Sequence, residues 1–201
     1  MITANMATIP LHLWASRIAD LQHPDWSILD LDPKDAPFEH VVRLALAIKK
    51  LCDEIELPCY CKTSGSTGLH VLIPLGGFCT YDQSRTLAQL LAKVVAGEHR
   101  KIATIIRNPA ARGGRVYVDY LQNGHGRLLV APYCVRPLPG APVSAPLRWS
   151  EVRKGLDLRR HTIRTMPPRM ARLRADPLRP LLDVRPDLTT ALERLARRLD
   201  G

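Results

Sequence analysis

The sequence predicts an α+β domain in which helices flank a mixed β-sheet. Residues 26–32, WSILDLD, alternate in polarity as a half-buried strand does, and Pro33 ends the run. Residues 37–56 instead repeat apolar side chains with the 3.6-residue period of a helix. Residues 115–120 and 127–133 are two further strand-like runs, and the turn QNGHG between them predicts a hairpin. Mixed strands and helices with an antiparallel pair are typical of the α+β class.

The rest of the chain extends this pattern. The further expected elements are strands at 59–63 and 69–75, the turn SGSTG at 64–68 between them, and helices at 82–97 and 187–199. The Pro-rich span 136–148 is expected to run extended along a surface. We therefore expect one core over residues 1–180, followed by a basic amphipathic helix within 181–201.

The composition indicates a globular protein with a polyanionic partner. The 201 residues are 46% apolar, which is ordinary for a packed domain, and the net charge is +10. Residues 151–201 hold 13 Lys or Arg and 7 Asp or Glu, which is +6 of that excess. Such a field favours nucleic acid or an anionic membrane surface. The alternative is an arginine-rich composition without a specific partner.

Location and redox state follow from what the sequence lacks. No apolar run reaches the roughly 18 residues that a membrane span requires. The start, MITANMATIP, has no charged region followed by an apolar stretch, so a secretory signal is not expected. The five cysteines are odd in number and include no CxxC pair. We expect reduced thiols in a cytoplasmic protein with no membrane partner.

Three aspartates are candidates for metal binding. Asp30 and Asp32 are two residues apart on a strand and therefore point to the same face, where they could share a cation. The alternative is a strand end whose carboxylates only cap a turn. Asp119 lies in the apolar run RVYVDY and could complete a two-metal site. Its alternative is a salt bridge to Arg112 or Arg115.

The turn SGSTGLH at 64–70 is a candidate phosphate site. Small residues and two glycines let backbone N–H groups approach a phosphate, and His70 could donate to a phosphate oxygen. No Gly-Lys-Ser/Thr follows, so this is not a P-loop, and an ordinary hairpin turn is the alternative. Arg112, Arg127 and Arg136 lie near the Asp119 run and suit bidentate phosphate contacts, although each singly could be a surface charge.

Five motifs together resemble a known family. DLDP, KTSGSTGLHV, VDYLQN, APYCVR and PGAPVSAPLRW occur in the order and at the spacing of the polymerase domain of bacterial DNA ligase D. That domain belongs to the archaeo-eukaryotic primase superfamily. The resemblance covers about residues 5–180 and is specific because the motifs are in register.

The resemblance implies a primase-polymerase core with an RNA-recognition-like β-sheet. It implies two Mn²⁺ or Mg²⁺ ions on Asp30, Asp32 and Asp119. It also implies addition of NTPs or dNTPs to DNA 3′ ends at double-strand breaks, together with Ku and an ATP-dependent DNA ligase in the bacterial nucleoid. By motif position, the implied nucleotide-binding residues are His12, Ser64, Gly65, Ser66, Thr67, Gly68, His70, Arg112, Gln122, Arg127 and Arg136.

The sequence departs from the family pattern in four places. Thr67 replaces a lysine or arginine, Arg127 replaces a lysine, and Cys134 replaces a serine. The match also begins about a hundred residues into the family domain, so an N-terminally truncated core is expected. Three functions stay open: a nucleotidyltransferase, a non-catalytic DNA-end or partner-binding remnant, and a two-metal phosphodiesterase. The last is weakest because no general base is evident beside the carboxylates.

Overall fold

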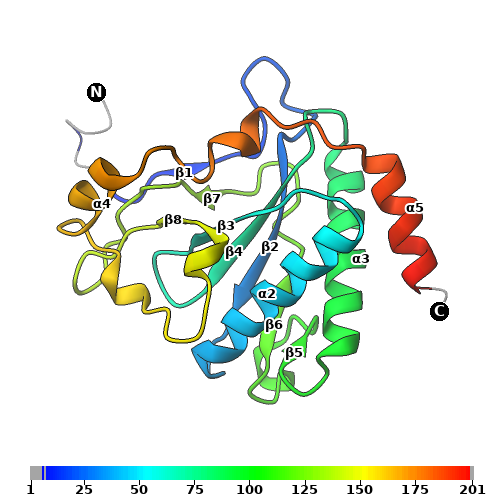
Figure 1. Cartoon of the computed structure of the whole chain (residues 1–201), viewed down its shortest axis with the longest axis horizontal. Coiled ribbons are helices and arrows are strands. Elements are labelled where there is room, and N and C mark those ends of the chain that lie inside the picture. Colours follow the sequence, from blue (N-terminus) through cyan, green and yellow to red (C-terminus); the bar gives the residue numbers. More distant parts are fainter. Residues whose placement is uncertain (1–5, 7, 200–201) are drawn as a thin grey trace.

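A six-stranded sheet forms the centre of the molecule. The computed structural model describes residues 6 and 8–199 (Figure 1). The sheet has the order β5-β6-β2-β4-β3-β8, with β5 and β6 parallel and the other neighbours antiparallel. Its strands are β2 (Trp26–Asp32), β3 (Tyr60–Thr63), β4 (Leu69–Pro74), β5 (Ala103–Thr104), β6 (Val116–Asp119) and β8 (Pro146–Leu147). The predicted mixed sheet is confirmed.

Two long helices cover one face of this sheet. They are α2 (Phe38–Glu54) and α3 (Tyr81–Glu98). The apolar positions of α2 that repeat with helical period are buried. α3 begins at a capping box, in which Thr80 accepts from the backbone N–H of Gln83 and Gln83 accepts from that of Thr80. Shorter helices are α4 (Met166–Arg172) and α5 (Leu188–Leu199), and α5 packs on the same core through Ala191 and Leu195.

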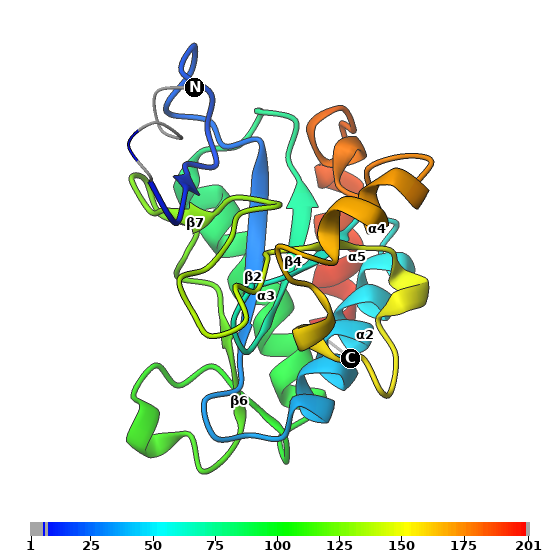
Figure 2. The same ribbon diagram turned by 90° about the vertical axis from the view of Figure 1, so that its left-hand side faces the viewer.

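The alternation of β2 separates the two faces of the sheet. Leu29 and Leu31 are fully buried among the side chains of α2 and α3. Asp30 and Asp32 therefore point to the opposite face, as expected for a period of two. Figure 2 shows this arrangement nearly edge-on, with β7 on one side of β2 and α2 on the other.

A small second sheet lies over that opposite face. It consists of β1 (His12–Leu13) and β7 (Leu129–Val130), paired antiparallel. Further along the face, Leu72 packs with Leu178 and Leu181. The 3₁₀ helices that complete the chain are Pro109–Ala111, Trp149–Glu151, Leu158–Arg160 and Arg179–Leu182. Within residues 6 and 8–199, no helix combines the length and the apolar character needed to cross a bilayer.

The predicted hairpin between 115–120 and 127–133 is wrong. β6 pairs with β2 and β5, whereas β7 pairs with β1 in the other sheet. The buried Asn123 explains the difference, because its Nδ2 donates to Ile28 O and its Oδ1 accepts from Ile28 N, both at 2.8 Å. This side chain ties the loop after β6 to β2, so the loop runs beside β2 instead of forming the turn of a hairpin.

The Pro-rich span 136–148 is not purely a surface segment. Its residues 143–147 are buried, and β8 joins the six-stranded sheet as an edge strand beside β3. An edge strand tolerates Pro146, since one side of it needs no ladder hydrogen bond. This segment borders the phosphate-site candidate at 64–68.

Candidate functional site

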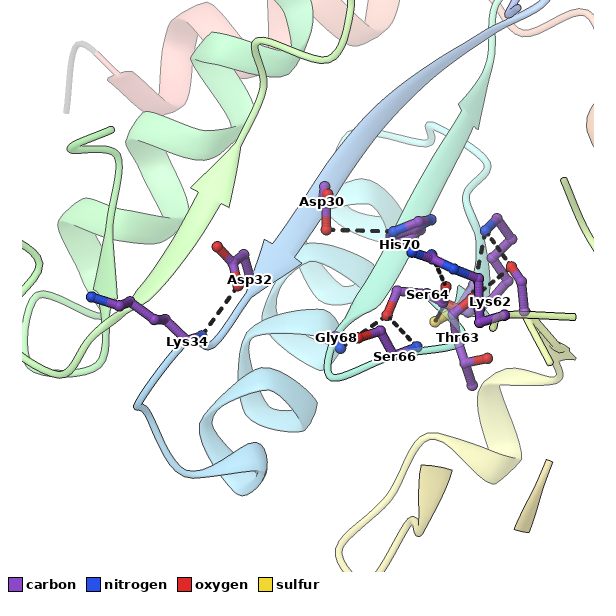
Figure 3. Close-up of polar contacts among 12 residues, drawn as sticks. Asp30, Asp32, Lys34, Lys62, Thr63, Ser64, Ser66, Gly68 and His70 are labelled. Atoms are coloured by element: carbon purple, nitrogen blue, oxygen red, sulfur yellow. Dashed lines mark hydrogen bonds and ion pairs between the residues drawn. The ribbon is translucent and has the colours of Figure 1, made fainter. Parts of the chain in front are cut away.

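The sheet register brings two of the predicted aspartates together. In the antiparallel pairs, Asp30 of β2 lies directly opposite Asp119 of β6 and opposite His70 of β4. Directly opposite residues share a face. The Oδ1 atom of Asp30 is 3.5 Å from Nε2 of His70, and Figure 3 shows these two side chains pointing toward one another.

Asp30 is in an electrostatically unfavourable place. Its side chain keeps only 23% of its exposed surface. Burial, and after it the nearby carboxylates of Asp119 and Asp32, together raise its pKa to about 7, although Lys62 and Arg136 oppose the shift. Burial also raises the pKa of Asp119. A bound cation would offset this repulsion.

The other two carboxylates already have partners. Arg112 Nη1 donates to Asp32 Oδ2 at 2.8 Å, and the backbone N–H of Lys34 donates to Asp32 Oδ1 at 3.1 Å. Asp119 Oδ1 accepts from the N–H of Leu121 at 2.7 Å and from the hydroxyl of Tyr117 at 3.2 Å. The alternative expected from the sequence was a salt bridge between Asp119 and Arg112. In the structure Arg112 pairs with Asp32 instead.

Three carboxylates on one face fit a hard divalent cation by their donor chemistry. Among residues 6 and 8–199, however, no three Asp, Glu, His or Cys side chains converge in a metal-binding group. Binding one ion with all three would place the cation beside the Arg112 guanidinium unless Asp32 releases it. The three carboxylates therefore suit a metal ion by their chemistry, but Asp32 is paired with Arg112.

The turn at 64–68 is closed on itself. Ser64 Oγ accepts from the N–H groups of Ser66 at 3.1 Å and Gly68 at 3.0 Å, and Ser64 N donates to Gly68 O at 3.0 Å. Figure 3 shows this cluster beside β4. Two of the N–H groups expected to cradle phosphate are therefore used inside the turn. Arg136 contacts the turn directly, because its Nη1 donates to Ser64 O at 3.1 Å.

Two glycines allow the turn to sit where it does. A Cβ atom at Gly68 would lie 2.2 Å from the carbonyl oxygen of Leu31, so the turn packs directly against the end of β2. Gly65 has φ +72°, and a Cβ atom there would lie 2.8 Å from Cγ of Arg136. Glycine at both positions keeps the turn close to β2 and to Arg136.

One cavity of about 240 Å³ connects these parts. Its lining residues are His12, Asp30, Leu31, Asp32, Ser64, Thr67, Gly68, His70, Gln122, Leu128, Leu129, Val130 and Arg136. His12 reaches it because β1 pairs with β7, where His12 lies opposite Val130. Residues far apart in the sequence therefore form a single carboxylate-lined and arginine-lined pocket.

The remaining predicted residues lie around the cavity. Gly65 and Ser66 complete the turn, Asp119 faces Asp30, and Arg112 contacts Asp32. Arg127 does not line the cavity. It is exposed in the loop before β7, where its backbone N–H donates to Gly124 O.

The sequence reasoning missed Lys62. This lysine is 0% exposed, and its Nζ donates to Ser144 Oγ at 2.6 Å. Burial lowers its pKa to about 7, and it also lowers the pKa of His70, helped by the charges of Lys62 and Arg136. His70 is therefore neutral. The available signal was a lysine inside an otherwise apolar strand, two residues before Ser64.

Comparison with known proteins places the chain in a family. The family model described as "LigD, primase-polymerase domain" matches residues 1–178. The chain is 33% identical over 172 residues to the multifunctional non-homologous end joining protein LigD of Pseudomonas aeruginosa. That match covers 85% of this chain and 20% of the relative. It is also 33% identical over 147 residues to the bifunctional non-homologous end joining protein LigD of Bacillus subtilis. That match covers 72% of this chain and 24% of the relative.

A solved structure agrees with these sequences. The polymerase domain of Mycobacterium tuberculosis ligase D, in complex with DNA, superposes with a TM-score of 0.74 at 28% identity. The match covers 82% of this chain and 57% of that one, so the chain spans just over half of the solved domain. The α+β primase-polymerase fold expected from the motifs is confirmed. The chain therefore belongs to the LigD primase-polymerase domain family.

Proposed function

We propose that this domain is a metal-dependent nucleotidyltransferase that adds NTPs or dNTPs to DNA 3′ ends during non-homologous end joining. One observation carries the proposal: a single cavity joins the carboxylates of β2 to the turn at 64–68 and to Arg136. A nucleoside triphosphate needs both an anion-binding wall and carboxylates for divalent ions. Membership of the family supports the same conclusion.

Asp30, Asp32 and Asp119 would hold one or two Mn²⁺ or Mg²⁺ ions. When bound, such ions neutralise the triphosphate and activate the attacking 3′ hydroxyl. Asp32 would then exchange Arg112 for the cation. The freed guanidinium of Arg112, which lies over the ring of Tyr117 at 4.3 Å, would remain beside the site as a counter-charge.

The other cavity residues would bind and orient the nucleotide. Arg136 would pair with phosphate oxygens at the turn, where Ser64, Gly65, Ser66, Thr67 and Gly68 shape the wall. His70, buried and neutral, would donate one hydrogen bond to a phosphate oxygen. His12 and Gln122 would contact the sugar or base from the opposite side. Arg127, exposed and directly before the lining residue Leu128, would add positive charge near the cavity.

The partners follow from charge and from the relatives. The net charge of +10 suits the phosphates of a DNA double-strand-break end. The solved relative is described in complex with DNA, and the sequence relatives are named as end-joining proteins. Ku and an ATP-dependent DNA ligase would be the protein partners, at the nucleoid of the bacterial cytoplasm.

Primer extension on a recessed DNA end, with Mn²⁺ and ribonucleotides, tests the proposal. The wild-type chain should add nucleotides, and Asp30→Asn should reduce addition by at least about a hundredfold, since it removes a charged metal ligand. Asp35→Asn, an exposed aspartate on the loop after β2, is the matched control and should extend normally. Equal extension by Asp30→Asn and wild type would refute the metal assignment.

A second function, a non-catalytic DNA-end or partner-binding module, is favoured by one observation. Asp32 is paired with Arg112, and the described residues contain no convergent group of three metal ligands. If this function holds, neither wild type nor Asp30→Asn extends the primer. Both then shift DNA in a gel, with an affinity that falls steeply as salt rises.

A further inference from the structure

Lys62 is a buried charge that the proposed chemistry does not use. Its side chain is the largest among those fully buried in the described structure. The side chain lies on the site face of β3, because Lys62 is paired with His70 in the register. Nevertheless it does not line the nucleotide cavity. Burying an ammonium group is costly unless its hydrogen bonds are satisfied, so its contacts require an explanation.

The contacts of Lys62 lead to Ser144. Lys62 Nζ donates to Ser144 Oγ at 2.6 Å, and Ser144 Oγ donates to the carbonyl of Thr63 at 2.9 Å. Thr63 Oγ1 in turn donates to Val143 O at 2.9 Å and accepts from Ala145 N at 2.8 Å. The end of β3 is thereby fastened to residues 143–145.

The same segment is hydrogen-bonded to the residues around Arg136. The backbone N–H of Ser144 donates to Cys134 O at 2.9 Å, and the N–H of Tyr133 donates to Ser144 O at 2.7 Å. Arg136 N donates to Pro142 O at 2.8 Å. This bond closes the loop between residues 133–136 and residues 142–144. Fixing Ser144 therefore also fixes the backbone from which Arg136 extends.

The two groups expected to meet a triphosphate thus share one support. Ser64 begins the turn directly after Thr63, and Arg136 contacts the carbonyl of Ser64. A displacement of residues 143–145 from β3 would move Arg136 away from the turn. Figure 3 shows Lys62 and Thr63 beside the turn residues Ser64 and Ser66.

We propose that Lys62 and Ser144 are positioning residues that hold the turn at 64–68 and Arg136 together as one rigid binding wall for a nucleoside triphosphate. This inference rests on the proposed function. It differs from a direct role, because both side chains are fully buried and neither lines the cavity. Their hydrogen bonds hold Thr63 and the backbone of Arg136 in place. This limits how far Arg136 can move away from the turn.

Calorimetric binding of ATP and of inorganic tripolyphosphate, without DNA, tests the inference. Ser144→Ala and Lys62→Met should each weaken both ligands by about tenfold, the equivalent of one displaced contact. The double variant should be no weaker than the worse single variant, because the two residues act as a unit. Cys61→Ala is the matched control: it is equally buried on β3 but faces the helices, and should bind normally.

Hydrogen exchange adds a measurement that does not need the nucleotide. The amides of Ser66 and Gly68 should exchange faster in Ser144→Ala and Lys62→Met than in wild type or Cys61→Ala. If Ser144→Ala does not fold because it leaves Lys62 unpaired, the double variant removes both polar groups and supplies the same comparison.

Four outcomes overturn the inference. Unchanged affinity and exchange in both variants would make Lys62 and Ser144 merely structural. Weaker binding in Lys62→Met with normal binding in Ser144→Ala would show that Lys62 acts by its charge and not by positioning. If wild type binds neither ligand, both the proposed function and the inference fail. If wild type binds the ligands but the amides of Ser66 and Gly68 exchange normally in the variants, only the rigid support is rejected.

Discussion

The two faces of the six-stranded sheet differ sharply although the same strands form them. On β2, Leu29 and Leu31 are completely buried under α2 and α3, whereas Asp30 and Asp32 face the cavity. On β4, Val71 and Ile73 point to the helices, whereas His70 points to the site. The main apolar core lies on the helix face, and the chemically active side chains lie on the other.

The cavity face concentrates charge at a cost that the helix face offsets. Asp30, Asp119, Lys62 and His70 all have pKa values displaced by burial. A packed apolar layer beneath them can tolerate this, since each buried aliphatic side chain contributes roughly 1.5–3 kcal/mol to stability. Displaced pKa values gathered on one face of a sheet, around a cavity, are typical of functional sites.

The largest expected effect is on the helix face. Leu31→Ala should lower the free energy of unfolding by about 2–5 kcal/mol, because it leaves a void in the core. Asp32→Asn, the next residue on the opposite face, has a side chain that is 44% exposed and should cost about 1 kcal/mol or less. Urea unfolding of both variants measures the difference, and equal losses would contradict the division of roles between the faces.

On the cavity face, removing a charge should stabilise the metal-free protein. Asp30 has a folded pKa of about 7 against an ordinary 3.8, so the folded state binds its proton more tightly than the unfolded state does. Its contribution therefore favours folding below about pH 4 and is lost as the pH rises to about 7. Asp30→Asn avoids this loss and should be more stable at pH 8, by an amount on the order of 2 kcal/mol.

Urea unfolding in chelator at pH 5 and pH 8 measures this second effect. The advantage of Asp30→Asn should be larger at pH 8 than at pH 5, and Asp35→Asn should show no such trend. Added Mn²⁺ should raise the stability of wild type and leave Asp30→Asn unchanged, because a ligand stabilises only the form that binds it. If Asp30→Asn were less stable than wild type at pH 8, the charge of Asp30 would not be unfavourable in the folded protein.

The smallest effect concerns the support of Asp119. Tyr117→Phe removes the hydroxyl that donates to Asp119 Oδ1, which should cost about 0.5–1.5 kcal/mol in unfolding free energy. The pKa of Asp119 should rise further, because that hydrogen bond lowers it. NMR titration of the carboxyl carbon measures the shift. Tyr60→Phe, at the apolar end of the same face, should leave the Asp119 titration unchanged.

Much of the central sheet could be predicted from local patterns. The strand 26–32, the helix at 37–56 and the pair of strands around 64–68 appear within a few residues of their expected bounds. These segments have clear periods of two or of 3.6 residues, and strong turn signals separate them. The shared face of Asp30 and Asp32 follows from the strand period alone.

Other parts of the site depend on contacts between distant segments. No strand was expected at β1, and β7 lies in a run that was expected to pair with β6, yet the pairing of β1 with β7 carries His12 into the cavity. The side chain of Asn123 redirects the loop after β6, and Ser144 reaches Lys62 across 82 residues of sequence. No local pattern encodes such partners, because each arises only when the sheet has formed.

By itself, the sequence determined the family motifs, the main strands and helices, and which face of each strand the candidate residues occupy. These are properties of short segments, set by backbone periodicity and by glycine or proline at turns. Only the tertiary structure decided that Arg112 pairs with Asp32 and not with Asp119, and that the turn at 64–68 and Arg136 share one buried support. Such choices depend on which charged groups are buried side by side, and burial is a property of the packed molecule.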